Sequence, residues 1–361
     1  MRNNERNIGF RAAPRGHRRG VEMKRREFLA FFGTALVSAR NIALAQTPSP
    51  PSAAKQSKPV RIVVVANTYY EGDGVMSAVC NRMAHDARIG VPRDVVWPRQ
   101  VATDDRDIIP KPRCLIDAQA STGATTAVVE VWCLDDLMSS HVPHGSSDKK
   151  ALAMRMITEY GPAPDGVVAF GTAGYPGDPS NDGCATIGST IFIRDAANDG
   201  SGEHSNWTWP GHMGVLVPSK TPTTFFSSVI GDQATVDTIS REMLAVPVNP
   251  AAKLQLIIAA DAVAISSVNI PRGSDFGPVD SRAIAAAQNA GAMNITSVET
   301  THGVIRAQWP DAFFIYVTAI PNRVGHFADE AGGNYAQEFA STHNAGIALK
   351  HIMPHFVAAI A

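Results

Sequence analysis

The chain has 361 residues and nearly balanced charge, with 32 Lys and Arg residues against 33 Asp and Glu residues. Residues 1–45 hold ten of the basic residues and three of the acidic ones, so the remainder carries a net charge of −8. Such an acidic protein lacks the basic surface that binds a phosphate backbone, and we expect no nucleic-acid partner. The four cysteines contain no Cys-x-x-Cys pair for zinc or redox chemistry.

The N-terminal segment has the pattern of a twin-arginine export signal. Arg25 and Arg26 precede an apolar stretch that ends at Val37, and a site suited to signal peptidase follows at Ala45. The apolar stretch is shorter than the ~20 residues of a membrane-spanning helix. We therefore expect residues 1–45 to be a cleaved signal peptide, the mature protein to be periplasmic, and no membrane anchor to remain.

The rest of the chain predicts a linker and one α/β domain. Residues 46–59 are rich in Pro, Ser, Ala and Lys and show no apolar periodicity, which is typical of a flexible linker. In residues 60–361, β-branched runs alternate with helical patterns, which favours a three-layer αβα sandwich with a mainly parallel or mixed central sheet. The expected strands are 61–66, 127–134, 254–260, 293–298 and 312–320, and the expected helices are 75–87, 148–160 and 335–361.

An irregular stretch over residues 197–222 interrupts this alternation. It carries glycines, two tryptophans and two histidines, and we expect a long loop able to cover a pocket. Cys114 and Cys184 lie in loop-like surroundings and are the expected pair if one disulfide forms, whereas Cys133 lies in a strand pattern typical of the core.

Three residues near the C-terminus, Phe276, Glu299 and Asn322, follow one another at steps of 23. Phe276 closes a predicted turn from Gly273 to Gly277, and the other two follow strand-like runs. An aromatic ring can stack on a base, a carboxylate can accept hydrogen bonds from ribose hydroxyls, and an amide can bind the edge of a purine. Because open α/β sheets bind ligands at the ends of neighbouring strands, the spacing predicts a nucleoside pocket.

This layout resembles the nucleoside phosphorylase and nucleosidase superfamily. Residues 164–174 look like that family's central strand followed by its Gly-(Ser/Thr)-Ala-Gly turn. Residues 187–196 are similar to a later strand of the family, with Ser189 in place of an acidic residue. The resemblance covers most of residues 60–361 and implies the family's αβα fold and a homo-oligomer.

The resemblance also implies roles for the residues of the pocket. Glu299 would bind the 2′ and 3′ hydroxyls of the ribose, with Val298 beside it, and Phe276 would stack on the base. Asn322 takes a place that is Asp in nucleosidases and Asn in one branch of purine phosphorylases. An amide can hydrogen-bond N7 and O6 of a purine but cannot transfer a proton, which favours a 6-oxopurine nucleoside.

The nucleophile would lie near Thr172, whose hydroxyl and neighbouring backbone amides, from Gly171 to Gly174, can hold a phosphate or the attacking water. The phosphorylases that this turn resembles have an arginine where this chain has Ala169. Losing that cation favours hydrolysis over phosphorolysis. The cations left to reach a phosphate from elsewhere are Arg194, Arg272 and Arg323.

Hydrolysis needs a base to activate water. Glu71, which follows the first strand, matches the position of such a base in the family, and Asp73 is the reserve candidate. The histidines and serines of the sequence favour no other chemistry. A third metal ligand accompanies neither of the two histidine pairs, His141 with His144 and His204 with His212, and no Gly-x-Ser-x-Gly elbow occurs. We expect no metal and no cofactor, and we leave phosphate open as a co-substrate.

The sequence thus predicts an enzyme that binds a purine nucleoside and cleaves its N-glycosidic bond, as a nucleosidase or a phosphorylase. The stretch from Asn322 to Tyr335 also resembles the purine nucleoside permease group of the same superfamily. That resemblance implies the alternative, a nucleoside-binding protein with little or no catalysis that assists uptake. A purely structural αβα domain is the third hypothesis, and it offers no reason for these residues to gather around one pocket.

Overall fold

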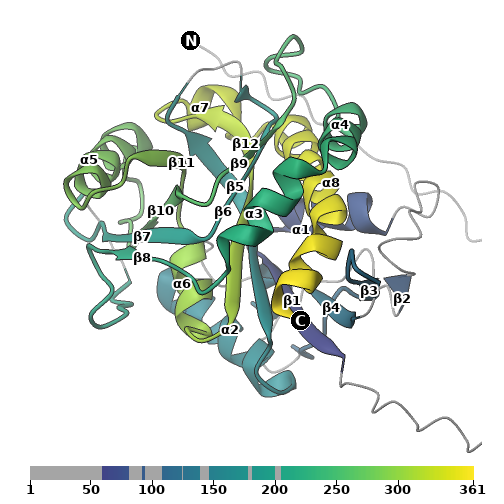
Figure 1. Cartoon of the computed structure of the whole chain (residues 1–361). Coiled ribbons are helices and arrows are strands. Elements are labelled where there is room, and N and C mark those ends of the chain that lie inside the picture. Colours follow the sequence, from purple (N-terminus) through teal and green to yellow (C-terminus); the bar gives the residue numbers. More distant parts are fainter. Residues whose placement is uncertain are drawn as a thin grey trace, which may run out of the picture. The chain divides into compact units, whose positions relative to one another are not determined.

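The computed structural model describes residues 59–80, 92–93, 108–123, 125–138, 146–177, 181–199 and 205–361 (Figure 1). The predicted signal peptide, almost all of the predicted linker, and His141, His144 and His204 lie outside the described residues. What the sequence predicts for those segments therefore stays a prediction.

One mixed sheet organises the described residues. Its main path runs β2-β3-β4-β1-β5-β11-β10-β7-β8, and β12, β6 and β9 branch from β5. The strands are β1 Val60–Ala66, β2 Pro92–Arg93, β3 Cys114–Gln119, β4 Thr126–Cys133, β5 Gly166–Tyr175, β6 Ala185–Gly188, β7 Thr190–Asp195, β8 Leu216–Val217, β9 Leu256–Ile258, β10 Ala262–Val268, β11 Asn294–Glu299 and β12 Phe313–Arg323.

Strand β5 lies at the centre of this sheet, as the sequence predicts for residues 164–174. It pairs in parallel with β1 on one side and with β12 on the other, so the carboxyl ends of all three strands meet at one edge. Gly174, near the end of β5, lies opposite Asn322 of β12 and also opposite Val298 of β11, which pairs with β5 in the antiparallel direction. This register brings three of the predicted site residues together.

Helices cover both faces of the sheet, which confirms the predicted three-layer αβα sandwich. Along β1, Ile62 and Val64 pack into one apolar core while Val63 and Val65 pack into another. A strand that is buried on both faces is apolar at every position, and this explains its unbroken β-branched run. The helices are α1 Tyr69–Val79, α2 Ser147–Tyr160, α3 Thr223–Gly231, α4 Gln233–Glu242, α5 Phe276–Asn289, α6 His302–Gln308, α7 Phe327–Glu330 and α8 Tyr335–Ile360, with the 3-10 turn η3 Leu134–Leu137.

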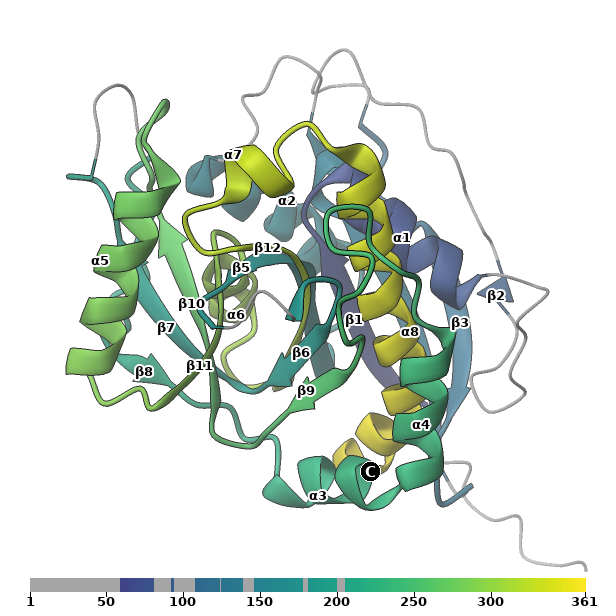
Figure 2. The same cartoon turned by 90° about the horizontal axis from the view of Figure 1, so that it is seen from above.

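The two cores belong to opposite layers. Helices α1, α3, α4 and α8 contribute to the first core, and α2 and α6 contribute to the second. Figure 2 shows α8 running beside α1, with α5 at the other end of the sheet over β10 and β11. Among the described residues, no helix combines the length and apolar character that crossing a membrane requires.

Helix α1 differs from its prediction because it begins at Tyr69 and not near residue 75. Gly72 and Gly74 suggest a turn in the sequence, but they are helical residues at close contacts. A Cβ on Gly72 would lie 2.5 Å from Nη1 of Arg113, and a Cβ on Gly74 would collide with Thr342. These glycines therefore let neighbouring segments approach the helix.

The region before α5 also differs from its prediction. The apolar run 254–260 forms only the short β9, and β10, which the sequence analysis missed, follows it. Phe276 is the first residue of α5, capped by the side chain of Asp275, and not the end of a turn. Similarly, Gly171 to Gly174 lie within β5 and form no turn.

The predicted disulfide is corrected, and the predicted loop is confirmed in part. The described part of the stretch 197–222 is irregular apart from the two-residue β8, but its two tryptophans pack on the second core and none of its described residues lines the cavity described below. All four cysteines are free. The Sγ atom of Cys114 lies 3.5 Å from that of Cys80, whereas Cys184 donates to the carbonyl of Lys253, so the predicted pair of Cys114 and Cys184 is wrong.

Candidate active site

A cavity of about 170 Å³ opens where β1, β5, β11 and β12 end. All of the residues predicted for the site line it, namely Glu71, Gly171, Thr172, Gly174, Phe276, Val298, Glu299 and Asn322. The enclosed volume lies below the ~300–1,000 Å³ of typical small-molecule pockets, so a ligand of ordinary size would fill it and extend to its mouth. The structure brings these residues together, and their individual roles stay predictions.

Glu71 lies at the start of α1 and ties this helix to the sheet. Its Oε2 accepts the backbone N–H groups of Asn67 and Thr68, each at 2.8 Å. Its Oε1 accepts the backbone N–H of Thr172 at 2.7 Å and the hydroxyl of Thr172 at 2.8 Å. Burial raises the pKa of Glu71, and these four hydrogen bonds oppose the rise. The carboxylate thus joins the first turn of α1 to the end of β5.

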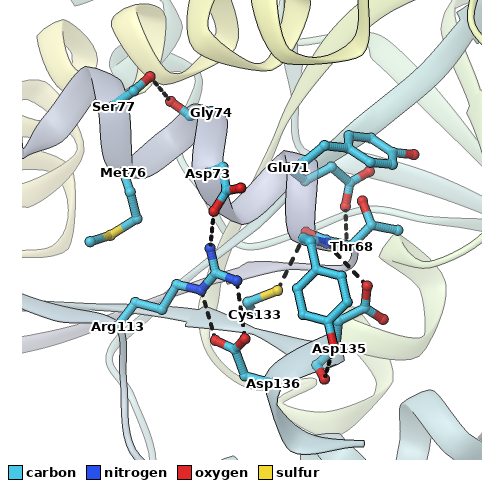
Figure 3. A network of polar contacts seen from close by, with 12 residues as sticks. Thr68, Glu71, Asp73, Gly74, Met76, Ser77, Arg113, Cys133, Asp135 and Asp136 are labelled. Atoms are coloured by element: carbon cyan, nitrogen blue, oxygen red, sulfur yellow. Dashed lines mark hydrogen bonds and ion pairs between the residues drawn. The ribbon is translucent and has the colours of Figure 1, made fainter. Parts of the chain in front are cut away.

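The reserve base, Asp73, points away from the cavity and does not line it. Figure 3 shows its carboxylate on Arg113, whose Nη1 donates to it at 2.9 Å. Arg113 also donates to both carboxylate oxygens of Asp136, at 2.7 and 3.0 Å, and the hydroxyl of Tyr335 donates to Asp73 at 3.2 Å. This ion-pair network holds α1 against β3 and η3, so Asp73 is a structural group.

Glu299, the last residue of β11, presents one free oxygen to the cavity. Its Oε2 accepts the backbone N–H groups of Thr301 and His302. Its Oε1 is buried and has no hydrogen-bond partner among the described residues. An unpaired buried carboxylate oxygen is costly unless a ligand completes its hydrogen bonds. Glu299 is therefore poised to accept a donor from a bound molecule.

A buried lysine stands behind Glu299. The Nζ of Lys150, on α2, donates to the hydroxyls of Thr300 and Thr301 at 2.9 and 2.8 Å. Burial lowers the pKa of Lys150 to about 8, and the charge of Glu299 opposes that change. Lys150 does not line the cavity, so it supports the end of β11 from the second core and does not reach a ligand.

The mouth of the cavity is aromatic. Phe276 and Phe327 lie with ring centroids 5.5 Å apart, and both are exposed, at 39% and 38%. Asn322 lines the same cavity and is buried, and its Nδ2 donates to the carbonyl of Arg323 at 2.7 Å. Two exposed rings beside a buried amide suit a planar base with a polar edge.

Asp280 lies one helical turn after Phe276 and lines the same wall. It is 9% exposed. Burial raises the pKa of Asp280 to about 7, although a hydrogen bond from the backbone of Gly325 opposes the rise. Near neutral pH the carboxyl group of Asp280 can therefore carry a transferable proton in the cavity, which the amide of Asn322 cannot.

Asp280 gives a testable dependence of stability on pH. The ordinary pKa of an aspartate is 3.8, so between about pH 4 and 7 the folded protein keeps a proton that the unfolded chain has lost. The free energy of unfolding therefore falls as the pH rises through this window. Asp280→Asn removes this titration, and we expect it to stabilise the protein by roughly 1–4 kcal/mol at pH 8 and hardly at all at pH 4. Denaturant titrations at both pH values measure the difference, and an equal effect at both would contradict this account.

Neither Lys nor Arg lines the cavity among the described residues. Arg194 pairs with Asp199, and Arg323 pairs with Glu330, so two of the three cations considered for phosphate are engaged elsewhere. The third, Arg272, is exposed and does not line the cavity. Within the described ranges, no group of three His, Cys, Asp or Glu side chains is arranged to hold a metal ion.

The sequence analysis did not name every residue of the cavity wall, and those it missed include Tyr70, Asp280, His302 and Phe327. Two of them had a signal, because Asp280 follows Phe276 by four residues and His302 follows Glu299 by three. Placing Phe276 in a turn hid the first, since a spacing of four puts residues on one face only within a helix. Tyr70, whose hydroxyl lies 3.4 Å from that of Thr172, and Phe327 had no such signal.

Comparison with known proteins gives a fold likeness at low identity. No protein-family model matches the sequence, and no curated protein matches it significantly. The structure is similar to 5′-methylthioadenosine/S-adenosylhomocysteine nucleosidase of Neisseria meningitidis, at 13% identity over 81% of this chain and 98% of that one, with a TM-score of 0.45. It is also similar to futalosine hydrolase of Helicobacter pylori, at 10% identity over 81% and 97% of the two chains, with a TM-score of 0.45.

A third similar structure is S-adenosylhomocysteine nucleosidase of Streptococcus pyogenes, at 12% identity over 82% of this chain and 97% of that one, with a TM-score of 0.45. A likeness at these scores adds nothing to the case for a function, which depends on the geometry of the cavity. The chain is similar in fold, at low sequence identity, to these two nucleosidases and to futalosine hydrolase.

Proposed function

We propose that this protein binds a purine nucleoside in the cavity at the ends of β1, β5, β11 and β12 and hydrolyses its N-glycosidic bond. The observation that carries the proposal is the buried Oε1 of Glu299, which has no hydrogen-bond partner among the described residues and belongs to the same cavity wall as Phe276 and Thr172. A carboxylate oxygen that lacks a donor is matched by a ribose hydroxyl, which supplies one.

The arrangement also suits the charges of the reaction. Cleaving the bond builds positive charge on the sugar and negative charge on the departing base, and groups already in place for those charges lower the barrier. Glu299 would lie beside the sugar. Asn322 and Asp280 would lie at the edge of the base, with Phe276 and Phe327 against its faces. The attacking water would lie near Thr172.

Hydrolysis is favoured over phosphorolysis by the lining of the cavity. A phosphate dianion needs cationic or multiple N–H donors, and arginine supplies them best. Among the described residues of the wall there is no arginine or lysine. Water needs no such cation, so we propose water as the acceptor.

A release assay tests the proposal. Purified protein would be incubated with inosine, guanosine or adenosine, with and without phosphate, and the free base followed by chromatography. We expect release of hypoxanthine or guanine at a rate that phosphate does not change. Release only in the presence of phosphate would make the protein a phosphorylase. Glu159→Gln, an exposed carboxylate on α2, is a control for changes in charge alone.

A second function is favoured by two features of the site. Asn322 cannot protonate a departing base, and the acceptor positions of Glu71 are already occupied by four donors. Both features suit a protein that binds a nucleoside and assists its uptake without cleaving it. Nucleoside binding in the absence of any base release would establish this alternative.

The identity of residue 322 should set the preference for the base. Asn322→Asp introduces a group that can protonate N7, so we expect the ratio of adenosine to inosine cleavage to rise by about tenfold or more and the pH optimum to fall. Asn334→Asp is the matched control, since Asn334 caps α8 and does not line the cavity. An unchanged ratio would place residue 322 outside the base site.

We also propose that the protein is exported by the twin-arginine route and acts in the periplasm. We expect Arg25→Lys with Arg26→Lys to leave the protein in the cytoplasm with residues 1–45 attached, because the pathway recognises the arginine pair. The neighbouring pair Arg18 and Arg19, changed in the same way, is the control. Fractionation and mass spectrometry give the location and the N-terminus, and normal periplasmic accumulation of the first double variant would refute the signal.

A further inference from the structure

His302 is a buried histidine whose ring lacks hydrogen bonds. It is 1% exposed and lines the cavity, and neither Nδ1 nor Nε2 has a hydrogen-bond partner among the described residues. Its backbone N–H is held by Glu299, and its ring stacks on Tyr316 with centroids 6.0 Å apart. A fixed, buried ring with two unsatisfied nitrogens is expected only where a ligand or water completes it.

Glu71 has little capacity left to act as a base. A carboxylate offers about four lone-pair positions, and four donors from Asn67, Thr68 and Thr172 already occupy those of Glu71. To take a proton from water, Glu71 would have to give up a bond that holds α1 to β5. The carboxylate is therefore better suited to holding the site together than to removing a proton.

The space beside Gly171 is bounded by the side chains of His302 and Glu71. A Cβ placed on Gly171 would lie 3.3 Å from Nε2 of His302 and 3.3 Å from Oε1 of Glu71. The missing side chain leaves room in front of Nε2 on the Thr172 side of the cavity. On its other side, Nδ1 of His302 lies 3.7 Å from the free Oε1 of Glu299. The ring thus bridges the proposed ribose site and the proposed water site.

We propose that His302 is the general base that activates the attacking water, with Nδ1–H directed at Glu299 and the lone pair of Nε2 directed at the water beside Gly171. This inference rests on the proposed hydrolysis of a nucleoside. A carboxylate that accepts a hydrogen bond from one ring N–H fixes the tautomer and leaves the other nitrogen basic. The mechanism moves the role predicted for Glu71 to a residue that the sequence analysis missed.

The step balances without any further reactant. An O–H bond of water breaks and its proton moves to Nε2, while the water oxygen bonds to C1′ of the ribose. The bond from C1′ to the purine nitrogen breaks, and its electron pair leaves with the base. The departing base takes up one proton and the imidazolium returns one to solvent, so the sum of the reaction is the addition of water across the glycosidic bond.

Burial keeps the histidine neutral, which this role requires. Burial lowers the pKa of His302, while the carboxylates of Glu299 on β11 and Glu71 on α1 oppose the change and Lys150 on α2 reinforces it. The rate should therefore fall on the acid side as the imidazole becomes protonated, and remain high at neutral pH.

Substitutions distinguish whether His302 or Glu71 acts as the general base. We expect His302→Gln to lower kcat for inosine by about 100- to 10,000-fold, to leave the Kd within about threefold, and to abolish the acid limb of the pH profile. Gly171→Ala is a second variant that removes no functional group, and its methyl group would fill the water site and lower kcat in the same way. His343→Gln, on α8 outside the cavity, is the matched control.

Each outcome decides between the two bases or rejects the proposed function. If the acid limb persists in His302→Gln and disappears in Glu71→Gln, Glu71 is the base and the inference is overturned. Cleavage at the normal rate by His302→Gln also overturns it while leaving the proposed function intact. If the wild-type protein binds no purine nucleoside, the proposed function itself fails, and binding without cleavage overturns both the proposed hydrolysis and the inference.

A spectroscopic measurement on the unmodified chain tests the tautomer directly. Nitrogen NMR of protein labelled at histidine distinguishes a protonated Nδ1 from a protonated Nε2. We expect His302 to carry its proton on Nδ1 at neutral pH, with His302→Gln used only to assign the signal. A proton on Nε2 in the presence of a non-cleavable inosine analogue would contradict the inference.

Discussion

Glu299→Gln should weaken the binding of inosine by about 10- to 150-fold, which corresponds to roughly 1.5–3 kcal/mol. The free Oε1 of Glu299 is the acceptor that a ribose hydroxyl would meet, and the amide that replaces it donates on one side and carries no charge. The backbone N–H groups of Thr301 and His302 can still be accepted by the amide oxygen, so the fold at the start of α6 should persist. Titration calorimetry measures the Kd of both proteins.

A ligand without the 2′ and 3′ hydroxyls of the ribose provides the control for the affinity loss in Glu299→Gln. We expect 2′,3′-dideoxyinosine to bind the wild-type protein and Glu299→Gln with similar, weak affinity, because neither complex can form the bonds in question. Glu159→Gln should bind inosine as the wild type does. Equal affinity of wild type and Glu299→Gln for inosine would show that Glu299 does not contact the ribose.

Arg113→Met should destabilise the fold by about 3–5 kcal/mol, because it leaves a buried carboxylate without its cation. Arg113 and Asp136 are 2% and 3% exposed, and two hydrogen bonds join them. The same guanidinium holds Asp73 on α1, two residues after Glu71 (Figure 3). The loss should therefore affect the cavity as well as the stability, and urea titration measures the free energy of unfolding.

An exposed arginine gives the matched comparison. The side chain of Arg282 is 47% exposed and pairs with Asp199, which keeps Arg194 as a second partner. We expect Arg282→Met to cost less than about 1 kcal/mol. If Arg113→Met costs no more than Arg282→Met, the buried network does not position α1.

Much of the fold follows from periodicity in the sequence. The strands β1, β4, β11 and β12 and the helices α2 and α8 lie where apolar patterns predict them, within a few residues. They are long or buried on both faces, so their apolar residues carry a clear signal. The start of α1 was obscured because Gly72 and Gly74 serve contacts with Arg113 and Thr342, which only the tertiary structure brings close.

Part of the site was predictable because two of its residues lie at the ends of predicted strands. Glu299 and Asn322 lie at strand ends, and the sheet places strand ends together whatever the details of the loops. His302 and Asp280 were missed because their spacing from Glu299 and Phe276 indicates at most a shared face, and their importance lies in their surroundings. An unpaired ring nitrogen, or a carboxyl group whose pKa is raised by burial, is a property of packing that spacing alone does not reveal.

A crystal structure of the protein with a non-cleavable inosine analogue tests the central claim most directly. We predict that the analogue occupies the cavity, with a ribose hydroxyl within about 3.2 Å of Oε1 of Glu299. The base should lie against Phe276 and Phe327, with its edge on Asn322. An empty cavity at saturating analogue, or a sugar bound away from Glu299, would contradict the proposed nucleoside site.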